Sequence, residues 1–280
     1  MRTILVVANE TLAGPKLIAR AREEAAKGDV RVVVCVPRKN PSHGNFIYED
    51  VVFEAAQVRV DLARSVLREL GVNAVGEVGD PDPYSATMDM VAEYHPDHII
   101  VSTLPSTASG WLRRDLVERI EDATGTSVEH LVTDLSDETS PFDTTLVVAN
   151  RTTNSDALIA ELRREADAEP AGRARLFVFI VPQEGGEGMA QKRARARLDQ
   201  VVDRARGADL LAAGMTGDPD PYTATMNALS FFDVDDIVIS TYPETRSGWL
   251  RADLIDRVRK ASGKPVTHIV SDPEGAGVTA

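Results

Sequence analysis

The sequence predicts two consecutive copies of one small α/β domain, each built around a parallel β-sheet. Two observations carry this prediction. Residues 79–116 and 217–254 align without a gap and are identical at 22 of 38 positions, more than chance produces. Within each copy, short apolar segments alternate with longer amphipathic ones, which is the pattern of βαβ units. The fold class is therefore α/β, repeated in tandem.

The repeat also gives the domain boundaries. TILVVANET at 3–11 matches TTLVVANRT at 144–152, close to the start of each copy. We place copy one at 1–135 and copy two at 144–280, with a polar, proline-containing segment between them. Each copy then has a typical domain size.

The predicted strands of copy one are continuous apolar runs rich in valine and isoleucine. Such runs are typical of strands that are buried on both faces of a parallel sheet. The second strand, VRVVVCV, holds the only cysteine, Cys35, which we expect to be a buried structural thiol. In chain order, the strands are expected at 3–8, 30–36, 73–78, 98–102 and 128–133.

The predicted helices rest on apolar residues at helical spacing and on end signals. Gly71 suits the C-terminal cap of the second helix. Asp82 and Asp220 suit the N-caps of the third helix of each copy, with Pro83 and Pro221 at the first helical position. We favour this capping role over a magnesium site and predict no metal. In chain order, the helices of copy one are expected at 14–27, 50–70, 83–94 and 109–123.

Composition excludes several classes of function. The net charge of −13 disfavours nonspecific binding to nucleic acid or anionic membranes. No segment approaches the roughly 18–20 apolar residues of a membrane span, and no signal-peptide pattern opens the sequence. We therefore expect a cytoplasmic protein. Because Rossmann, Walker, nucleophile-elbow and zinc-cluster motifs are absent, we do not expect an enzyme.

The first candidate site residues follow strand one of each copy. In open parallel sheets, ligands bind beyond the carboxyl ends of the strands, where the winding direction switches. Ala8 and Asn9 lie there in copy one, and Asn150 lies there in copy two. Each asparagine could hydrogen-bond a ligand or hold its own turn.

The loop after strand four supplies most of the other candidates. It reads STLPSTASGWLRRDL in copy one and STYPETRSGWLRADL in copy two, and it leads into a predicted helix N-terminus, which favours an anion. The alternative is that the serine before its glycine, Ser109 or Ser247, caps that helix. The candidate ligand-binding residues of this loop are Ser102, Thr103, Ser106, Ser109, Gly110 and Arg113, with Ser240, Thr241, Ser247, Gly248 and Arg251.

Arg113 and Arg251 are expected in the first turn of helix four, where a positive charge opposes the helix dipole. A bound phosphate would compensate through a charge-assisted contact. A salt bridge to Asp80 or Asp218 is the alternative. His130 and His268, which repeat in strand five, are expected to be structural or interface residues.

These segments resemble the universal stress protein family. GDPDPYSATMDMVAEYHPDHIIVS is similar to the family segment in which a Gly-Asp-Pro turn opens the third helix, and ILVVANET is similar to its first strand and ligand-facing turn. The resemblance implies a Rossmann-like, five-stranded parallel sheet of order 3-2-1-4-5, a stress-response role, and often ATP binding. It also adds the turn residues Gly79, Asp80, Gly217 and Asp218 to the candidate site.

One motif of the ATP-binding family members is missing. Its glycine and serine positions hold Thr103, Ser106, Leu116 and Val117 in copy one, and Thr241, Glu244, Leu254 and Ile255 in copy two. Because Glu244 adds a negative charge near a phosphate, we expect copy one to bind better.

The sequence thus predicts a stress-response or signalling protein that binds ATP, another nucleotide or a small anionic ligand at the carboxyl edge of each sheet. The alternative is a ligand-free structural or protein-interaction module with degenerate sites. We expect the copies to pair through their fifth strands as an intramolecular pseudo-dimer, and the whole chain could form a homodimer.

Overall fold

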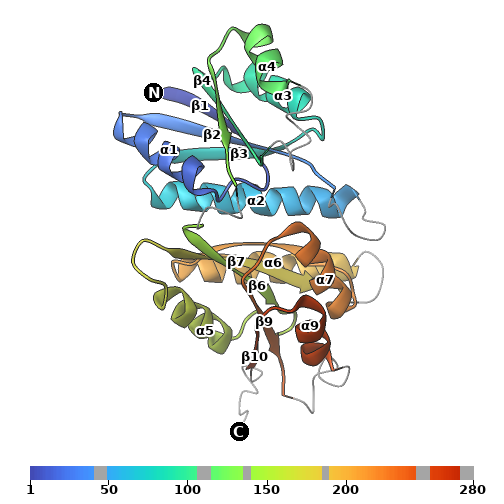
Figure 1. The fold of residues 1–280 in the computed structure, drawn as a ribbon. Coiled ribbons are helices and arrows are strands. Elements are labelled where there is room, and N and C mark those ends of the chain that lie inside the picture. Colours follow the sequence, from blue (N-terminus) through green and yellow to red (C-terminus); the bar gives the residue numbers. More distant parts are fainter. Residues whose placement is uncertain (41–48, 106–114, 135–139, 185–188, 244–252, 272–280) are drawn as a thin grey trace. The chain divides into compact units, whose positions relative to one another are not determined.

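The structure is a computed structural model that describes residues 1–40, 49–105, 115–134, 140–184, 189–243 and 253–271. Contacts divide these residues into two compact units. Unit one holds the described residues up to Pro141, and unit two holds those from Phe142 onward. Both units are drawn in Figure 1.

Unit one is a five-stranded parallel sheet of order β3-β2-β1-β4-β5. This is the order expected from the family resemblance, so the predicted fold class is confirmed. Its elements are β1 (Arg2–Val7), α1 (Pro15–Ala26), β2 (Val30–Pro37), α2 (Glu49–Glu69), β3 (Asn73–Gly79), α3 (Pro83–Tyr94), β4 (His98–Thr103), α4 (Leu116–Thr124) and β5 (Val128–Val132).

Unit two repeats this topology. Its sheet has the order β10-β9-β6-β7-β8, which is again 3-2-1-4-5 when its strands are counted from β6 and read from the other edge. Its elements are β6 (Phe142–Val148), α5 (Asp156–Asp167), β7 (Ala174–Pro182), α6 (Met189–Gly207), β8 (Leu211–Gly217), α7 (Pro221–Phe231), β9 (Asp236–Thr241), α9 (Leu254–Ser262) and β10 (Val266–Val270).

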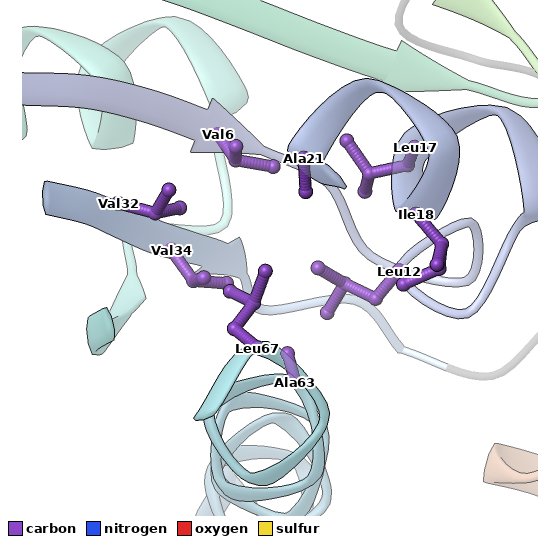
Figure 2. Close-up of a pocket in the computed structure, with 9 residues that line it drawn as sticks. All are labelled: Val6, Leu12, Leu17, Ile18, Ala21, Val32, Val34, Ala63 and Leu67. Atoms are coloured by element: carbon purple, nitrogen blue, oxygen red, sulfur yellow. The ribbon is translucent and has the colours of Figure 1, made fainter. Parts of the chain in front are cut away.

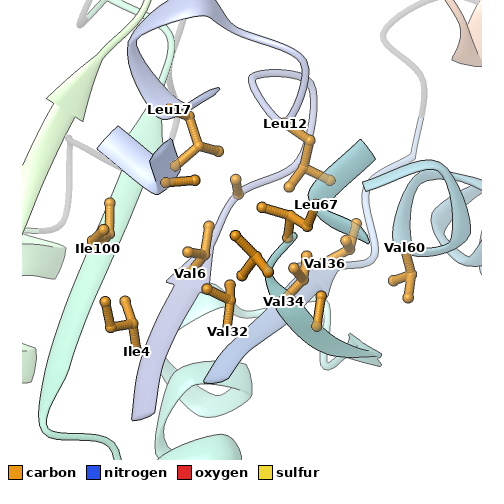
Figure 3. Close-up of a cluster of buried hydrophobic side chains, with 14 of the residues drawn as sticks. Ile4, Val6, Leu12, Leu17, Val32, Val34, Val36, Val60, Leu67 and Ile100 are labelled. Carbon is orange, nitrogen blue, oxygen red and sulfur yellow. The ribbon is translucent and has the colours of Figure 1, made fainter. Parts of the chain in front are cut away.

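Each sheet is buried on both faces, which explains the continuous apolar strands. In β1, Ile4 and Val6 face α1 and α2, and Figure 3 shows them within that layer of side chains. Leu5 and Val7 point to the other face, where α3 and α4 pack. Because neighbouring residues alternate between the two cores, every position of the strand interior has to be apolar.

The helix predicted over 109–123 is wrong at its start. The described helix α4 begins only at Leu116, and Asp115 before it is in the left-handed region with φ of 47°. Asp253 has the same conformation, with φ of 49°, before α9 in unit two. A left-handed aspartate cannot continue an α-helix, so no single helix runs through these positions.

Unit one contains an apolar cavity between β1, β2, α1 and α2. Figure 2 shows the lining side chains around a small cavity of about 20 Å³. No lining residue carries a polar side chain. The lining residues are Val6, Leu12, Leu17, Ile18, Ala21, Val32, Val34, Ala63 and Leu67.

Unit two fills the equivalent space with larger side chains. The register of the strands places Phe177 at the position of Val32 and Phe179 at the position of Val34. Leu162 of α5 stands where α1 has Ala21. All three are fully buried, so larger side chains occupy in unit two the layer that contains the small cavity in unit one.

A buried glutamate at the amino edge of each sheet has different hydrogen-bond partners in the two units. Glu24 of α1 accepts hydrogen bonds from Arg2 at 2.5 Å, from Lys27 at 2.7 Å and from Arg20. Burial alone would raise the pKa of Glu24, but the bonds from Lys27 and Arg20 outweigh it and bring that pKa to about 2.

Glu165 of α5 occupies the equivalent position in unit two, without such partners. Its Oε2 is buried and lacks a hydrogen-bond partner in the described structure. Burial, helped by the nearby carboxylate of Asp236, raises the pKa of Glu165 to about 7. The charge of Arg175 opposes this shift only in part, and the Arg175 guanidinium bonds Glu169 at 2.6 Å and Asp236 at 2.5 Å.

We predict that Leu162→Ala lowers the free energy of unfolding by about 2–5 kcal/mol, because it opens a cavity in a closely packed layer. Ala21→Leu should cost less stability than Leu162→Ala, because part of the added side chain enters the small cavity beside Ala21. Urea titrations of the two variants check this. An Ala21→Leu variant that loses as much stability as Leu162→Ala would show that unit one has no such space.

We also predict a pH-dependent effect of Glu165→Gln. A carboxyl group whose pKa is higher in the folded state binds more protons there, so its contribution to stability is lost as pH rises from about 4.5 to about 7. The variant should therefore be more stable than the parent protein at pH 8, and nearly equal to it at pH 4.5. Thermal unfolding at both pH values measures the difference.

Glu24→Gln is the matched control, with the opposite expectation. The lowered pKa of Glu24 stabilises the fold above pH 4.5, and this contribution is lost as pH falls towards 2. Glu24→Gln should therefore destabilise at pH 8. Equal effects of the two substitutions at pH 8 would contradict the assigned environments.

Candidate functional site

The carboxyl edge of the unit-one sheet holds four of the predicted site residues. The chain passes from β1 to β2 on one side, while β4 adjoins β1 on the other, so the winding direction switches between β1 and β4. Ala8 and Asn9 directly follow β1, and Ser102 and Thr103 end β4. All four are buried. The paired strands therefore bring these residues together at the switch point.

The nitrogen of the Asn9 side-chain amide is hydrogen-bonded, whereas its oxygen has no partner among the described residues. Its Nδ2 donates to the carbonyl of Pro37 at the end of β2, at 2.6 Å. Since only the amide nitrogen can donate to a carbonyl, this bond fixes which end of the side chain is which. Its Oδ1 is buried and accepts no hydrogen bond within the described structure. The side chain therefore ties its turn to β2 and leaves an acceptor unsatisfied.

Two hydroxyl groups at the same edge of the sheet are also unsatisfied. Ser102 is 1% exposed, and Thr133, which follows β5, is fully buried. Neither Ser102 Oγ nor Thr133 Oγ1 has a partner among the residues described. The carbonyl of Ser102 does accept from Thr11 Oγ1 at 3.1 Å. Each unsatisfied buried group costs about 1–3 kcal/mol, so three of them at one edge require an explanation.

The repeated histidines bond to the repeated site threonines. Thr103 Oγ1 lies 2.9 Å from His130 Nε2, and Thr241 Oγ1 lies 2.8 Å from His268 Nε2. Burial lowers the pKa of both histidines, which favours the neutral ring. Histidine and threonine thus form one polar pair at each carboxyl edge, and the sequence did not indicate this pairing.

In unit two, the counterparts of these three unsatisfied polar atoms of unit one have hydrogen-bond partners. Asn150 Oδ1 accepts from Arg197 Nη1 at 2.6 Å. Ser240 Oγ and Ser271 Oγ, the counterparts of the Ser102 and Thr133 hydroxyls, lie 3.1 Å apart and bond each other. The two carboxyl edges therefore share a fold but differ in how their polar atoms are paired.

The Gly-Asp-Pro turns have structural roles. An added Cβ at Gly79 would lie 2.6 Å from Ala86 Cβ and 2.9 Å from the sulfur of the buried Cys35, so this glycine lets α3 approach the sheet. Asp80 Oδ1 accepts from the amide of Asp82 at 2.8 Å. Gly217 and Asp218 repeat this arrangement in unit two.

The N-cap prediction at the start of α3 and α7 is confirmed. Asp82 accepts from the amide of Ser85 at 3.1 Å, and Asp220 accepts from the amide of Thr223 at 3.0 Å. These carboxylates are therefore engaged at the helix start, as the capping interpretation requires.

Part of the predicted site lies outside the described residues. These positions are Ser106, Ser109, Gly110, Arg113, Glu244, Ser247, Gly248 and Arg251. The expected placement of Arg113 and Arg251 in a first helical turn, with their phosphate or aspartate partners, therefore stays a prediction.

Two arginines stack on tyrosines in equivalent places of the two units. The guanidinium of Arg119 lies over the ring of Tyr84 at 4.0 Å, and that of Arg257 lies over the ring of Tyr222 at 4.1 Å. These cation–π contacts join α4 to α3 and α9 to α7.

Sequence reasoning missed a set of charged residues at the carboxyl edges. Glu10 forms an ion pair with Lys39 at 3.0 Å, and their unit-two counterparts, Arg151 and Glu184, pair at 2.8 Å with the charges exchanged. Arg197 also belongs to this edge. The signal was present in the repeat, because the alignment pairs Arg197 with Arg59 and places opposite charges at residues 10 and 151.

The described residues contain no group of three or more metal-ligating side chains arranged to hold a metal ion. Among the same residues, no helix combines the length and the apolar character needed to cross a membrane.

Comparison with known proteins adds a likeness of fold. The sequence matches no protein-family model and no curated protein. A solved universal stress protein from Archaeoglobus fulgidus is 14% identical, with a TM-score of 0.35, over 98% of this chain and 97% of that one. A family member from Burkholderia pseudomallei is 18% identical, with a TM-score of 0.34, over 46% of this chain and 94% of that one.

A third similar structure is a universal stress protein in complex with cAMP. It is 15% identical, with a TM-score of 0.33, and covers 48% of this chain and 98% of its own. Identities and TM-scores this low carry no argument about function. The fold of this chain rests on its own strand order.

We predict that Gly79→Ala lowers the free energy of unfolding by about 1–3 kcal/mol, because its methyl group would overlap Ala86. Gly207→Ala is the control, since an added Cβ there meets nothing within 4 Å. It should be neutral or slightly stabilising. Urea unfolding of both variants checks the prediction, and a neutral Gly79→Ala would show that the close approach of α3 is not needed.

Proposed function

We propose that this chain is a tandem protein of the universal stress protein type that binds a nucleotide or another small anionic ligand at the carboxyl edge of the sheet. Its role would lie in stress response or signalling, through binding and not through catalysis. The observation that carries this proposal is the set of polar atoms without partners among the described residues at the carboxyl edge of unit one, namely Asn9 Oδ1, Ser102 Oγ and Thr133 Oγ1.

The position of these atoms supports a ligand role. Ligands of open parallel sheets bind at the switch point, and the three atoms belong to residues that end or follow β1, β4 and β5. A buried acceptor without a donor is unfavourable, and a ligand that supplies the donor removes that cost. Asn9 Oδ1 needs an N–H or O–H donor, which the amino group of a nucleobase or a ribose hydroxyl can provide.

A basic side chain at the carboxyl edge of unit one supports an anionic ligand. Lys39 lies there, in an ion pair with Glu10 at 3.0 Å. In unit two, Arg151, Arg193 and Arg197 lie within 4.0 Å of Glu184. A partly exposed basic side chain at this edge of a protein with a net charge of −13 favours phosphate or carboxylate groups there.

The remaining expectations from the sequence stay predictions. They are the pseudo-dimer of the two copies through their fifth strands, a homodimer of the whole chain, and a cytoplasmic location. The alternative function, a ligand-free interaction module, is distinguished from the proposal by direct binding measurements.

We predict that ATP or cAMP binds the full chain in isothermal titration calorimetry, and that Asn9→Ala weakens this binding at least tenfold. The variant removes the acceptor that the ligand would satisfy, and a tenfold loss corresponds to about 1.4 kcal/mol, within the range for one hydrogen bond to a charged or polar partner.

The matched control is Asn73→Ala, at the exposed start of β3 on the opposite edge of the same sheet. This variant should bind like the parent protein. Absence of binding by the parent protein at millimolar ATP and cAMP would favour the interaction module, and an unchanged affinity of Asn9→Ala would remove Asn9 from the site.

A further inference from the structure

The carboxyl edge of unit two is occupied by a network of its own side chains. Glu184, which follows β7, is the centre of this network. Its carboxylate bonds Arg151 Nε at 2.8 Å and lies 3.2 Å from Arg197 Nη1 and 4.0 Å from Arg193 Nη1. Hydrogen bonding from Arg151 lowers the pKa of Glu184, so the group is ionised and held by arginines on three positions.

Arg197 connects this network to the switch point. The same Nη1 that approaches Glu184 donates to Asn150 Oδ1 at 2.6 Å. Asn150 is the counterpart of Asn9, whose Oδ1 has no donor in the described structure. Arg197 therefore supplies, from within unit two, the hydrogen bond that a ligand would have to supply in unit one.

The surrounding contacts complete the closure of unit two. Tyr242, which follows β9, donates through its hydroxyl to the carbonyl of Arg151 at 2.8 Å. The hydroxyls of Ser240 and Ser271 bond each other at 3.1 Å. Each of the three positions whose side chains are unsatisfied in unit one is thus satisfied in unit two by protein atoms.

The difference does not come from a missing arginine. Arg59 of α2 is the counterpart of Arg197 in the repeat, and unit one keeps it. Burial lowers the pKa of Arg59 to about 10, opposed by the charge of Glu10. What differs is the position of the acidic residue. In unit two it is Glu184, which follows β7, whereas in unit one it is Glu10, directly after Asn9. A carboxylate placed at Glu184 holds Arg197 against Asn150.

We propose that the switch point of unit two is closed by Arg197 and Glu184, so that the whole chain takes a single ligand, in unit one. This inference rests on the proposed function, because it assigns that function to one of the two copies. Arg197 acts as an internal occupant: its guanidinium takes the place of the ligand's donor, and the ion pair with Glu184 keeps it there.

The first experiment measures stoichiometry on the full chain, with ATP and cAMP as probes in native mass spectrometry. We expect one bound nucleotide for the parent protein and one for Asn150→Leu. Arg197→Met should raise the number to two, while the control Arg195→Met, on the same helix but paired with Asp199 at 3.2 Å, should leave it at one.

Two bound nucleotides on the parent protein would overturn the closure and leave the proposed function standing. A number that stays at one for Arg197→Met would overturn the role of Arg197. No nucleotide on any variant would refute the proposed function, and the closure would then be decided by the second experiment, which needs no ligand.

The second experiment is a double-mutant cycle on urea unfolding midpoints. Since Arg197 and Asn150 bond directly, Asn150→Leu should lower the midpoint much less in the presence of Arg197→Met than alone. For the matched pair in unit one, Asn9→Leu and Arg59→Met, we expect additive shifts. Additive shifts for the unit-two pair would overturn the proposal.

Discussion

The constraint on which the rest of the structure depends is that each parallel sheet is covered by helices on both faces. Side chains such as Ile4 and Leu5 alternate between two separate cores, so the interior of a central strand such as β1 is apolar. In these central strands, polar side chains lie mainly near the strand ends. At the carboxyl ends the loops diverge around a switch point, and this is where Asn9, Ser102 and their counterparts lie. The same constraint explains Gly79, which is a glycine because the helix above it packs directly on the strand.

The two units have the same strand order but fill the same core layer with different residues. Val32, Val34 and Ala21 leave a cavity in unit one, where Phe177, Phe179 and Leu162 fill the layer in unit two. Glu24 contacts three basic side chains, whereas Glu165 has a buried oxygen without a hydrogen-bond partner among the described residues. Neither unit is uniformly the better packed or better paired one. Unit two has the fuller core and the more satisfied carboxyl edge, and unit one has the better satisfied amino edge.

The sequence predicts the parts of the structure that depend on local pattern. Strand positions follow from apolar runs, and the helix starts at Pro83 and Pro221 follow from the Asp-Pro signal, because capping involves residues only three apart. The start of α4 was predicted wrongly, since nothing local announces that Asp115 adopts a left-handed conformation. The bonds from Asn9 to Pro37 and from Arg197 to Asn150 join residues 28 and 47 positions apart, so they depend on how the strands and helices are placed. Only the repeat alignment hinted at them, through the paired arginines and the exchanged charges.

The pairing of polar atoms links stability to binding in different ways at the two edges. A buried acceptor without a donor makes the unliganded form of unit one less stable than it could be, and a ligand that donates to Asn9 recovers that free energy as affinity. In unit two, Arg197 already donates a hydrogen bond to the corresponding oxygen of Asn150. A ligand there would gain no free energy by satisfying that oxygen. Optimising a site for stability removes the unsatisfied groups that binding needs. A duplicated domain can divide these two demands between its copies, and the exchanged charges at Glu10 and Glu184 are the simplest difference in this chain that would have allowed it.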